Sequence, residues 1–255
     1  MAKALLQTED LTRRFGGVVA VNAVTLAVAP GEVHAVIGPN GAGKTTLVGL
    51  LSGEIIAQKG SIWFDDVEVT QLPVYRRSQL GVARSFQITS LFREFTALDN
   101  VALAVQAQRG HSFRFWCDAR RDDGLRKPAL VTLARVGLSE RAGVRVGELS
   151  HGEHRQLDIA IALATEPRLL LLDEPMAGLG PEESARMVEI LRELKGTVAI
   201  LLIEHHMEAI FTLADRLTVM LDGRIIAGGR PEVIRTDVAV RQAYLGEKGD
   251  FHHDA

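Results

Sequence analysis

The sequence is poor in cysteine, in long apolar runs and in net charge. Cys117 is the only cysteine among 255 residues, which excludes an intrachain disulfide or a multi-cysteine zinc site and fits a reducing compartment. No apolar run approaches the roughly 20 residues that cross a bilayer, and the N-terminus shows no secretory signal. We therefore expect a chain that is soluble by itself and that needs a partner to act at a membrane.

The net charge of the chain bears on whether it binds nucleic acid. A formal net charge of −3 at pH 7 argues against a strongly basic nucleic-acid-binding surface and leaves only a local patch open. The length suits one large α/β domain, or a core with one inserted lobe.

Strand and helix patterns alternate in the C-terminal half. Short apolar segments at residues 32–37, 169–172 and 197–203 are typical of buried strands, and residues 181–194 and 207–214 have helical periodicity. Strands that alternate with helices of this length predict a largely parallel sheet.

The N-terminal part has the pattern of antiparallel strands. Residues 5–11 and 18–28 are typical of strands, and residues 60–69 alternate apolar and polar side chains around an Asp-Asp turn, which predicts a β-hairpin. We expect these segments to form an antiparallel sheet beside the parallel core.

Residues from about 88 to 164 predict a mostly helical lobe. Helical periodicity is present at residues 99–108, 128–136 and 152–164, and an irregular segment that begins HSFRFWC interrupts it. Only the tail, residues 247–255, has a loosely ordered composition.

A glycine-rich loop carries the first chemical signal. Residues 38–45 read GPNGAGKT, which fits G-x-x-x-x-G-K-[ST] between a predicted strand and a predicted helix. Glycines let backbone N–H groups turn inward around phosphates, and the helix N-terminus adds favourable partial charge. Lys44 would reach the β- and γ-phosphates of ATP, and the Thr45 hydroxyl would ligate Mg²⁺. The expected ATP-binding residues of this loop are Gly38, Pro39, Asn40, Gly41, Ala42, Gly43, Lys44, Thr45 and Thr46.

Two carboxylates end an apolar strand, in the segment LLLLDE at residues 169–174. Asp173 at the strand tip can hold Mg²⁺ through its water shell, and Glu174 can polarise the attacking water as the catalytic base. We expect this strand to lie beside the phosphate loop, in the same sheet.

Residues 149–153 read LSHGE and precede a helix. Placed shortly before the two carboxylates, this segment resembles the signature motif of ABC ATPases, a family that the rest of the chain also resembles. The resemblance implies that two ATPase subunits meet head to tail. Ser150 and the backbone of Gly152 would then cap the γ-phosphate of the ATP that the partner holds.

The resemblance assigns roles to three more residues. Gln87, in ARSFQ, matches the glutamine loop, which senses Mg²⁺ and couples the site to the partner subunit. His205, in LLIEHH, matches the switch histidine that contacts the γ-phosphate, and Phe15, in RRFGG, matches the aromatic residue that stacks on adenine. The implied catalytic residues are Glu174, His205 and Gln87.

The implied fold is an α/β ABC ATPase, that is, a P-loop NTPase with a RecA-like parallel core. It has an N-terminal antiparallel β subdomain and an inserted helical subdomain. In a single domain over residues 1–255, the nucleotide-binding core with its antiparallel lobe would comprise residues 1–87 and 165–230. The helical signature lobe would be 88–164, and a family-specific tail would be 231–255.

Several positions depart from the family pattern. The signature is usually LSGGQ, but Ser150 and Gly152 are retained. Gly180 stands where many members have aspartate in a loop at the dimer interface, which could weaken communication across it. His206 stands where an acidic residue is common. His151 and His154 have i, i+3 spacing, and we interpret them as structural rather than metal-binding.

Residues 111–121, HSFRFWCDARR, join aromatic to basic side chains. Three interpretations stay open: a surface insertion without a specific role, contact with a permease or with lipid headgroups, and contact with nucleic acid. The first is favoured and the last is least supported.

Longer segments narrow the resemblance. RRFGGVVAV, GVARSFQITSLF, LDEPMAGLGPEES and the C-terminal ending are similar to the longer of two ATPases in importers of branched-chain and other hydrophobic amino acids. Such systems imply a second ATPase subunit in a hetero- or homodimer, two membrane permeases and, indirectly, a periplasmic substrate-binding protein. The ATPase is held at the cytoplasmic face of the inner membrane, with no nucleic acid expected.

Other machines have similar ATPases. Importers of urea, amides or aromatic acids and a lipopolysaccharide-type exporter remain alternatives. A soluble ABC protein that works on DNA or ribosomes is less supported, because those usually carry two cassettes or a long coiled-coil or zinc insertion.

Overall fold

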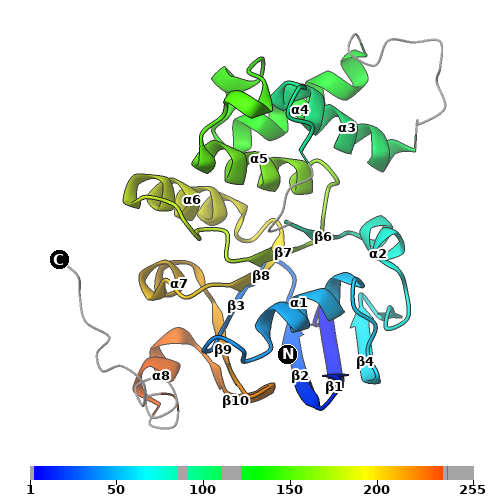
Figure 1. Cartoon of the computed structure of the whole chain (residues 1–255), viewed down its shortest axis with the longest axis vertical. Coiled ribbons are helices and arrows are strands. Elements are labelled where there is room, and N and C mark those ends of the chain that lie inside the picture. The colour runs from blue at the N-terminus through cyan, green and yellow to red at the C-terminus, as the bar shows by residue number, and fades with distance from the viewer. Residues whose placement is uncertain (1–2, 86–90, 111–121, 238–239, 241–255) are drawn as a thin grey trace.

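The computed structural model describes residues 3–85, 91–110, 122–237 and 240. Helices α3, α4 and α5 lie at one end of the molecule, the end farthest from the antiparallel strands β1, β2 and β4 (Figure 1). Gln87, the segment 111–121 and the tail 247–255 lie outside the described residues.

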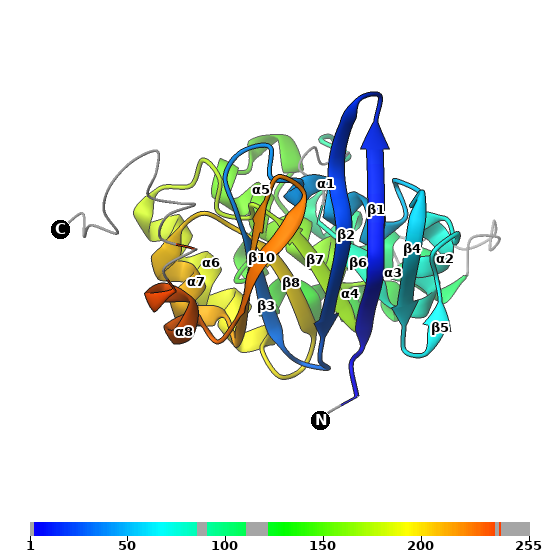
Figure 2. The same cartoon turned by 90° about the horizontal axis from the view of Figure 1, so that it is seen from below.

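The smaller sheet is antiparallel, with the strand order β2-β1-β4-β5, and its strands run side by side in Figure 2. Its strands are β1 (Leu6–Phe15), β2 (Val18–Val28), β4 (Lys59–Phe64) and β5 (Val67–Glu68). The predicted antiparallel sheet and the hairpin at 60–69 are therefore confirmed. β1 extends four residues beyond its predicted end, because the polar run after Leu11 continues to pair with β2 out to Phe15 and Val18.

The larger sheet has the order β10-β9-β3-β8-β7-β6. Its strands are β3 (Val33–Ile37), β6 (Val82–Arg84), β7 (Leu169–Asp173), β8 (Ala199–Ile203), β9 (Arg216–Leu221) and β10 (Arg224–Gly229). The pairs from β6 to β9 are parallel, as predicted, and β10 is antiparallel to β9. Strands β6, β9 and β10 were not predicted from the sequence.

β7 lies in the same sheet as β3, as predicted, and β8 lies between the two strands. Ile200 on β8 pairs with Val33 on one side and with Leu170 on the other. All five residues of β8 are buried, as expected for a central strand of a parallel sheet.

Alternate residues of β7 face different helices, since side chains of a strand point to opposite faces. Leu169 and Leu171 pack in a cluster with Leu47 of α1 (Lys44–Ser52) and with the antiparallel sheet. Leu170 and Leu172 pack in a second cluster with α6 (Pro181–Leu194) and the helical lobe. The remaining helices next to the sheets are α2 (Val74–Leu80), α7 (Met207–Leu213) and α8 (Pro231–Thr236).

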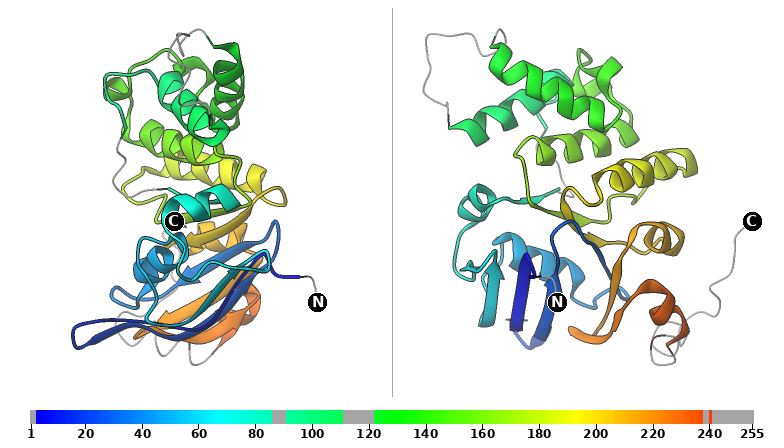
Figure 3. Two further views of the ribbon diagram at one scale, coloured as in Figure 1. Left: turned by 90° about the vertical axis from the view of Figure 1, so that its right-hand side faces the viewer. Right: turned by 180° about the vertical axis from the view of Figure 1, so that it is seen from behind.

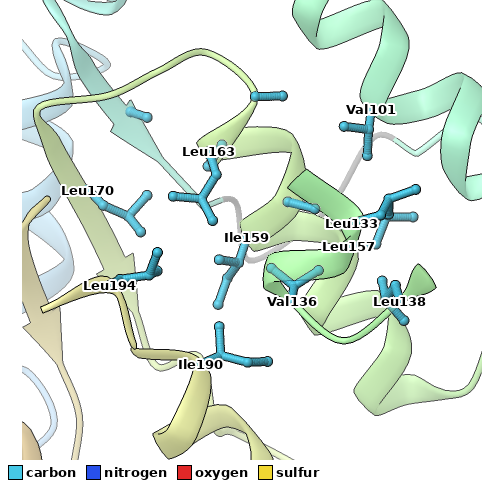
Figure 4. Close-up of a cluster of buried hydrophobic side chains, with 14 of the residues drawn as sticks. Val101, Leu133, Val136, Leu138, Leu157, Ile159, Leu163, Leu170, Ile190 and Leu194 are labelled. Atoms are coloured by element: carbon cyan, nitrogen blue, oxygen red, sulfur yellow. The ribbon is translucent and has the colours of Figure 1, made fainter. Parts of the chain in front are cut away.

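The helical lobe consists of α3 (Ala97–Arg109), α4 (Asp123–Arg135) and α5 (His151–Leu163), with the 3₁₀ turns η2 (Ser139–Arg141) and η3 (Val146–Glu148). Its helices cross above α6, as the side and back views show (Figure 3). In Figure 4, Leu157 of α5 lies beside Leu133 and Val136, whereas Ile159 and Leu163 lie toward Leu170 and Leu194. Because one apolar cluster runs through both parts, α5 joins the lobe to the sheet.

Helix α4 begins five residues before its predicted start at Pro128. A proline inside a helix removes one backbone donor, so the carbonyl of Gly124 loses its partner four residues on. The Arg109 Nη1 group donates to that carbonyl at 2.6 Å, and Asp122 caps the helix by accepting the Gly124 N–H at 2.8 Å. These contacts explain why the proline does not mark the helix start.

None of the helices in the described ranges is long and apolar enough to cross a bilayer. The division into a core, a lobe and a C-terminal tail at residues 88, 165 and 231 stays a prediction.

Candidate nucleotide site

The phosphate loop lies between β3 and α1, as predicted. Gly43 is the N-cap of α1 and has φ +97°, a region that favours glycine. A side chain there would also collide with the carbonyl of Ala20 on β2. The first turn of α1 has no acidic residue, so its free N–H groups can meet an anion without repulsion.

Lys44 folds back over this loop. Its Nζ donates to the carbonyls of Gly38 at 2.6 Å and Pro39 at 3.0 Å, and the residue is 8% exposed. Burial lowers the pKa of Lys44, and the nearby carboxylates of Glu174 and Asp173 oppose this shift. The ammonium is therefore held against the loop, with carbonyl partners that an anion can replace.

Asp173 lies at the end of β7 with its side chain fully buried. Burial raises the pKa of this carboxyl group, and Arg84, the Thr45 hydroxyl and Lys44 act in the opposite direction. The Arg84 Nη2 group lies 3.4 Å from Asp173 Oδ2, whereas Oδ1 has no hydrogen-bond partner among the residues that the structure describes. An unpartnered carboxylate oxygen beside a threonine hydroxyl fits Mg²⁺, which prefers oxygen ligands and retained waters.

Glu174 follows directly. Its backbone φ of +52° is unusual for a residue other than glycine, and its N–H donates to the carbonyl of Ile203 at 2.9 Å. This turn places its Oε1 atom 3.9 Å from Nδ1 of His205. A strained backbone at a carboxylate is a common feature of functional sites.

The signature segment begins α5. Ser150 is the N-cap, its hydroxyl accepts the N–H of Glu153 at 3.2 Å, and Glu153 Oε2 accepts the N–H of Ser150 at 2.8 Å. Glu153, the departure from the usual glutamine, therefore completes a capping box. Arg141 Nε also donates to its Oε1 at 2.6 Å.

Gly152 is buried and packs against α6. A side chain there would collide with the carboxylate of Glu183, which accepts the N–H of Gly180 at 3.2 Å. The signature segment and the loop that contains Gly180 are thus in direct contact. His154 Nε2 lies 2.8 Å from the carbonyl of Val146, which agrees with a structural role.

Known proteins share this arrangement. A family model described as "ABC transporter" matches residues 21–177, a span that includes the phosphate loop, the signature segment and both carboxylates. The chain belongs to the ABC transporter ATP-binding family. A second family model, described as "Branched-chain amino acid ATP-binding cassette transporter", matches residues 224–250.

Curated relatives resemble this cassette over nearly its full length. The high-affinity branched-chain amino acid transport ATP-binding protein LivG of Escherichia coli K12 is 39% identical, over 97% of this chain and 100% of that protein. BraF of Pseudomonas aeruginosa, with the same description, is also 39% identical, with the same coverage. The ribose import ATP-binding protein RbsA 1 of Burkholderia thailandensis is 37% identical, over 92% of this chain and 45% of that protein.

Solved structures match the fold. The crystal structure of a nucleotide-free ATP-binding cassette from an ABC transporter superposes with a TM-score of 0.84 at 28% identity, over 96% of this chain and all of the other. The ADP conformation of the cassette MJ1267 gives 0.85 at 29% identity, with the same coverage. The predicted ABC ATPase fold is therefore confirmed.

In this cassette, Phe15 lies at the tip of the β1–β2 hairpin. Its ring is 45% exposed, and the guanidinium of Arg13 lies 4.8 Å from the ring centroid. The same hairpin contributes Ala20, which packs against Gly43. Phe15 is thus an exposed aromatic ring on the hairpin that contacts the phosphate loop through Ala20. Such a ring can offer a stacking surface to a base.

Two residues at the site were not predicted from the sequence. Arg84 contacts Asp173, as described above. Glu204 is 1% exposed, and its carboxylate accepts the N–H groups of Met176 at 2.9 Å and His205 at 3.0 Å. Their positions in the sequence were the available signal. Arg84 ends an apolar strand three residues before Gln87, and Glu204 follows an apolar strand directly before His205.

Proposed function

We propose that this chain is the ATP-hydrolysing subunit of an importer for branched-chain or related hydrophobic amino acids. The observation that carries the proposal is the full-length similarity to LivG and BraF. The match of residues 224–250 to the branched-chain amino acid model supports the same cargo class, because it lies outside the region that matches the general family model.

ATP would bind along the phosphate loop. The N–H groups at the start of α1 and the Lys44 ammonium would contact the phosphates, and Phe15 would stack on adenine. Thr45 and Asp173 would hold Mg²⁺, with Gln87 completing the metal site. Bound Mg²⁺ would neutralise developing charge on the transferred phosphoryl group.

Hydrolysis would depend on Glu174 and His205. Glu174 would accept a proton from the attacking water, and His205 would contact the γ-phosphate. Both side chains are partly exposed, at 31% and 56%, so they are accessible to a nucleotide. Removal of the proton raises the nucleophilicity of the water as it attacks.

The site would be completed by a second ATPase subunit. Ser150 and Gly152 of one subunit would cap the γ-phosphate held by the other, so ATP would join the pair and hydrolysis would release it. The Ser150 hydroxyl accepts the Glu153 N–H through a lone pair, so its O–H stays available to donate to a phosphate oxygen. Two permeases would hold the pair at the cytoplasmic face of the membrane, with a periplasmic binding protein delivering cargo.

Uptake of labelled leucine tests the proposal. Cells that lack this chain should lose most high-affinity uptake, and the wild-type gene should restore it while Glu174→Gln should not. Unchanged uptake without the chain would contradict the leucine assignment. Mild solubilisation of native membranes should also co-purify two permeases and a second ATPase with the tagged chain.

A second cargo class is favoured by one observation, the similarity to the ribose import protein. Ribose uptake, measured in the same strains, separates the two. Loss of ribose uptake with normal leucine uptake would move the assignment to sugar import and leave the ATPase chemistry unchanged.

A further inference from the structure

Three consecutive residues between β8 and α7 bring metal-ligand atoms together. Glu204, His205 and His206 each offer one ligand atom, and these atoms all lie within 4.8 Å of one another. Nδ1 of His206 lies 3.0 Å from Glu204 Oε2, and Nδ1 of His205 lies 3.8 Å from the same oxygen. Four ligands at the usual zinc distances of about 2.0–2.2 Å are separated from one another by roughly 3.4 Å. The observed separations lie on both sides of that value.

Backbone N–H groups hold the Glu204 carboxylate in place. The Glu204 side chain is fully buried, its Oε1 accepts the Met176 N–H, and its Oε2 accepts the His205 N–H. Such outer contacts fix the orientation of a metal ligand. The two imidazoles are 56% and 47% exposed, so an ion can reach them from solvent.

A fourth possible ligand atom lies next to the group, since Glu174 Oε1 is 3.9 Å from Nδ1 of His205. Two imidazoles with carboxylates suit borderline ions such as Zn²⁺, whereas Mg²⁺ prefers oxygen ligands alone. The donor set therefore differs in kind from that of Thr45 and Asp173.

We propose that Glu204, His205 and His206 bind a divalent transition-metal ion of the Zn²⁺ class and that binding inhibits ATP hydrolysis. The ion replaces the hydrogen bond from His206 Nδ1 to Glu204. It also draws His205 and Glu174 away from the nucleotide. The inhibition rests on the proposed roles of Glu174 and His205, whereas the binding site itself does not.

Isothermal titration of Zn²⁺ into the nucleotide-free full chain tests the site. One saturable site is expected, and His206→Asn should weaken its affinity at least tenfold. The matched control is His252→Gln with His253→Gln, which removes an adjacent histidine pair elsewhere in the sequence and should change the affinity less than twofold. Equal affinity for wild type and His206→Asn, or a larger loss in the control, overturns the site.

ATPase turnover at saturating Mg-ATP, with free Zn²⁺ set by a metal buffer, tests the inhibition. Zn²⁺ should reduce wild-type turnover at the concentrations that fill the site, and His206→Asn should need at least tenfold more. Equal inhibition of both proteins overturns the inhibitory role. The proposed function is tested separately, because the titration does not depend on turnover. It fails if Glu174→Gln hydrolyses ATP at the wild-type rate without Zn²⁺.

Discussion

The guanidinium of Arg84 and the carboxylate of Asp173 meet at the end of two adjacent strands, with Nη2 and Oδ2 3.4 Å apart. The contact engages one carboxylate oxygen, and the other, Oδ1, has no hydrogen-bond partner in the described part of the chain. Arg84 also forms an ion pair with Glu54. The carboxylate that we propose as a Mg²⁺ ligand thus contacts a cation that lies three residues before Gln87 in the sequence.

Asp173→Asn should stabilise the nucleotide-free protein near neutral pH. Burial raises the pKa of Asp173, so the folded state holds this proton more tightly than the unfolded state. Stability therefore falls as pH rises from the unfolded pKa, about 3.9, to the folded pKa, and the cost is complete above both. Thermal unfolding should show a higher Tm for Asp173→Asn at pH 7, by roughly 2–4 °C per kcal/mol relieved.

Well below the unfolded pKa of about 3.9, the wild-type carboxyl is protonated in both states, so the difference in Tm should shrink. A lower Tm for Asp173→Asn at pH 7 would show that the contact with Arg84 outweighs desolvation. The variant should also lose Mg²⁺-dependent turnover, which separates the functional from the stability effect.

Lys44→Ala should weaken ATP binding about 100-fold, because charge-assisted hydrogen bonds to phosphate contribute roughly 1.5–3 kcal/mol each. Equilibrium binding of a fluorescent ATP analogue measures this. Lys59→Ala is the matched control, since Lys59 is exposed on β4, and its affinity should stay within twofold of wild type. Normal affinity in Lys44→Ala would refute the role of the loop.

Ser150→Arg should leave ATP binding by the isolated chain intact and prevent ATP-driven pairing. Sedimentation in a Glu174→Gln background, where hydrolysis does not reverse pairing, makes the difference visible. Losing a helix cap alone costs about 1 kcal/mol. Thr96→Arg controls for that loss, because Thr96 caps α3 through the Asp99 N–H at 3.0 Å. Pairing that survives Ser150→Arg would count against a contact with the partner's nucleotide.

Arg77→Leu should destabilise the fold by about 3 kcal/mol or more, since it leaves several buried carbonyls unpaired. Arg77 is fully buried, with burial lowering its pKa to about 10, so it stays charged at pH 7. Its guanidinium donates to the carbonyls of Leu50, Leu51, Thr70 and Leu72. It thereby ends the helix that carries the phosphate loop and complements the helix dipole. Urea unfolding measures the loss, and exposed Arg76→Leu should change stability by less than about 0.5 kcal/mol.

Much of the candidate site could be predicted because its residues stand in contiguous motifs. These are the phosphate loop at residues 38–45 and the apolar strand that ends at Asp173. The position of β8 between β3 and β7 was not predictable, since all three strands are buried throughout and none differs in a way that sets the order. Arg84 and Glu204 were missed for a related reason. Arg84 contacts Asp173, and Glu204 accepts the Met176 N–H, so each contact joins segments far apart in the chain that only the folded structure brings together.

The most direct test of the account compares ATP hydrolysis and ATP binding in Glu174→Gln and wild type, in the assembled transporter. The account predicts turnover reduced by about 10² or more, because general-base assistance contributes about 10²–10⁴ in rate, with ATP affinity within about twofold of wild type, since the phosphate contacts remain. Wild-type turnover in Glu174→Gln would contradict the account and place the base at another residue.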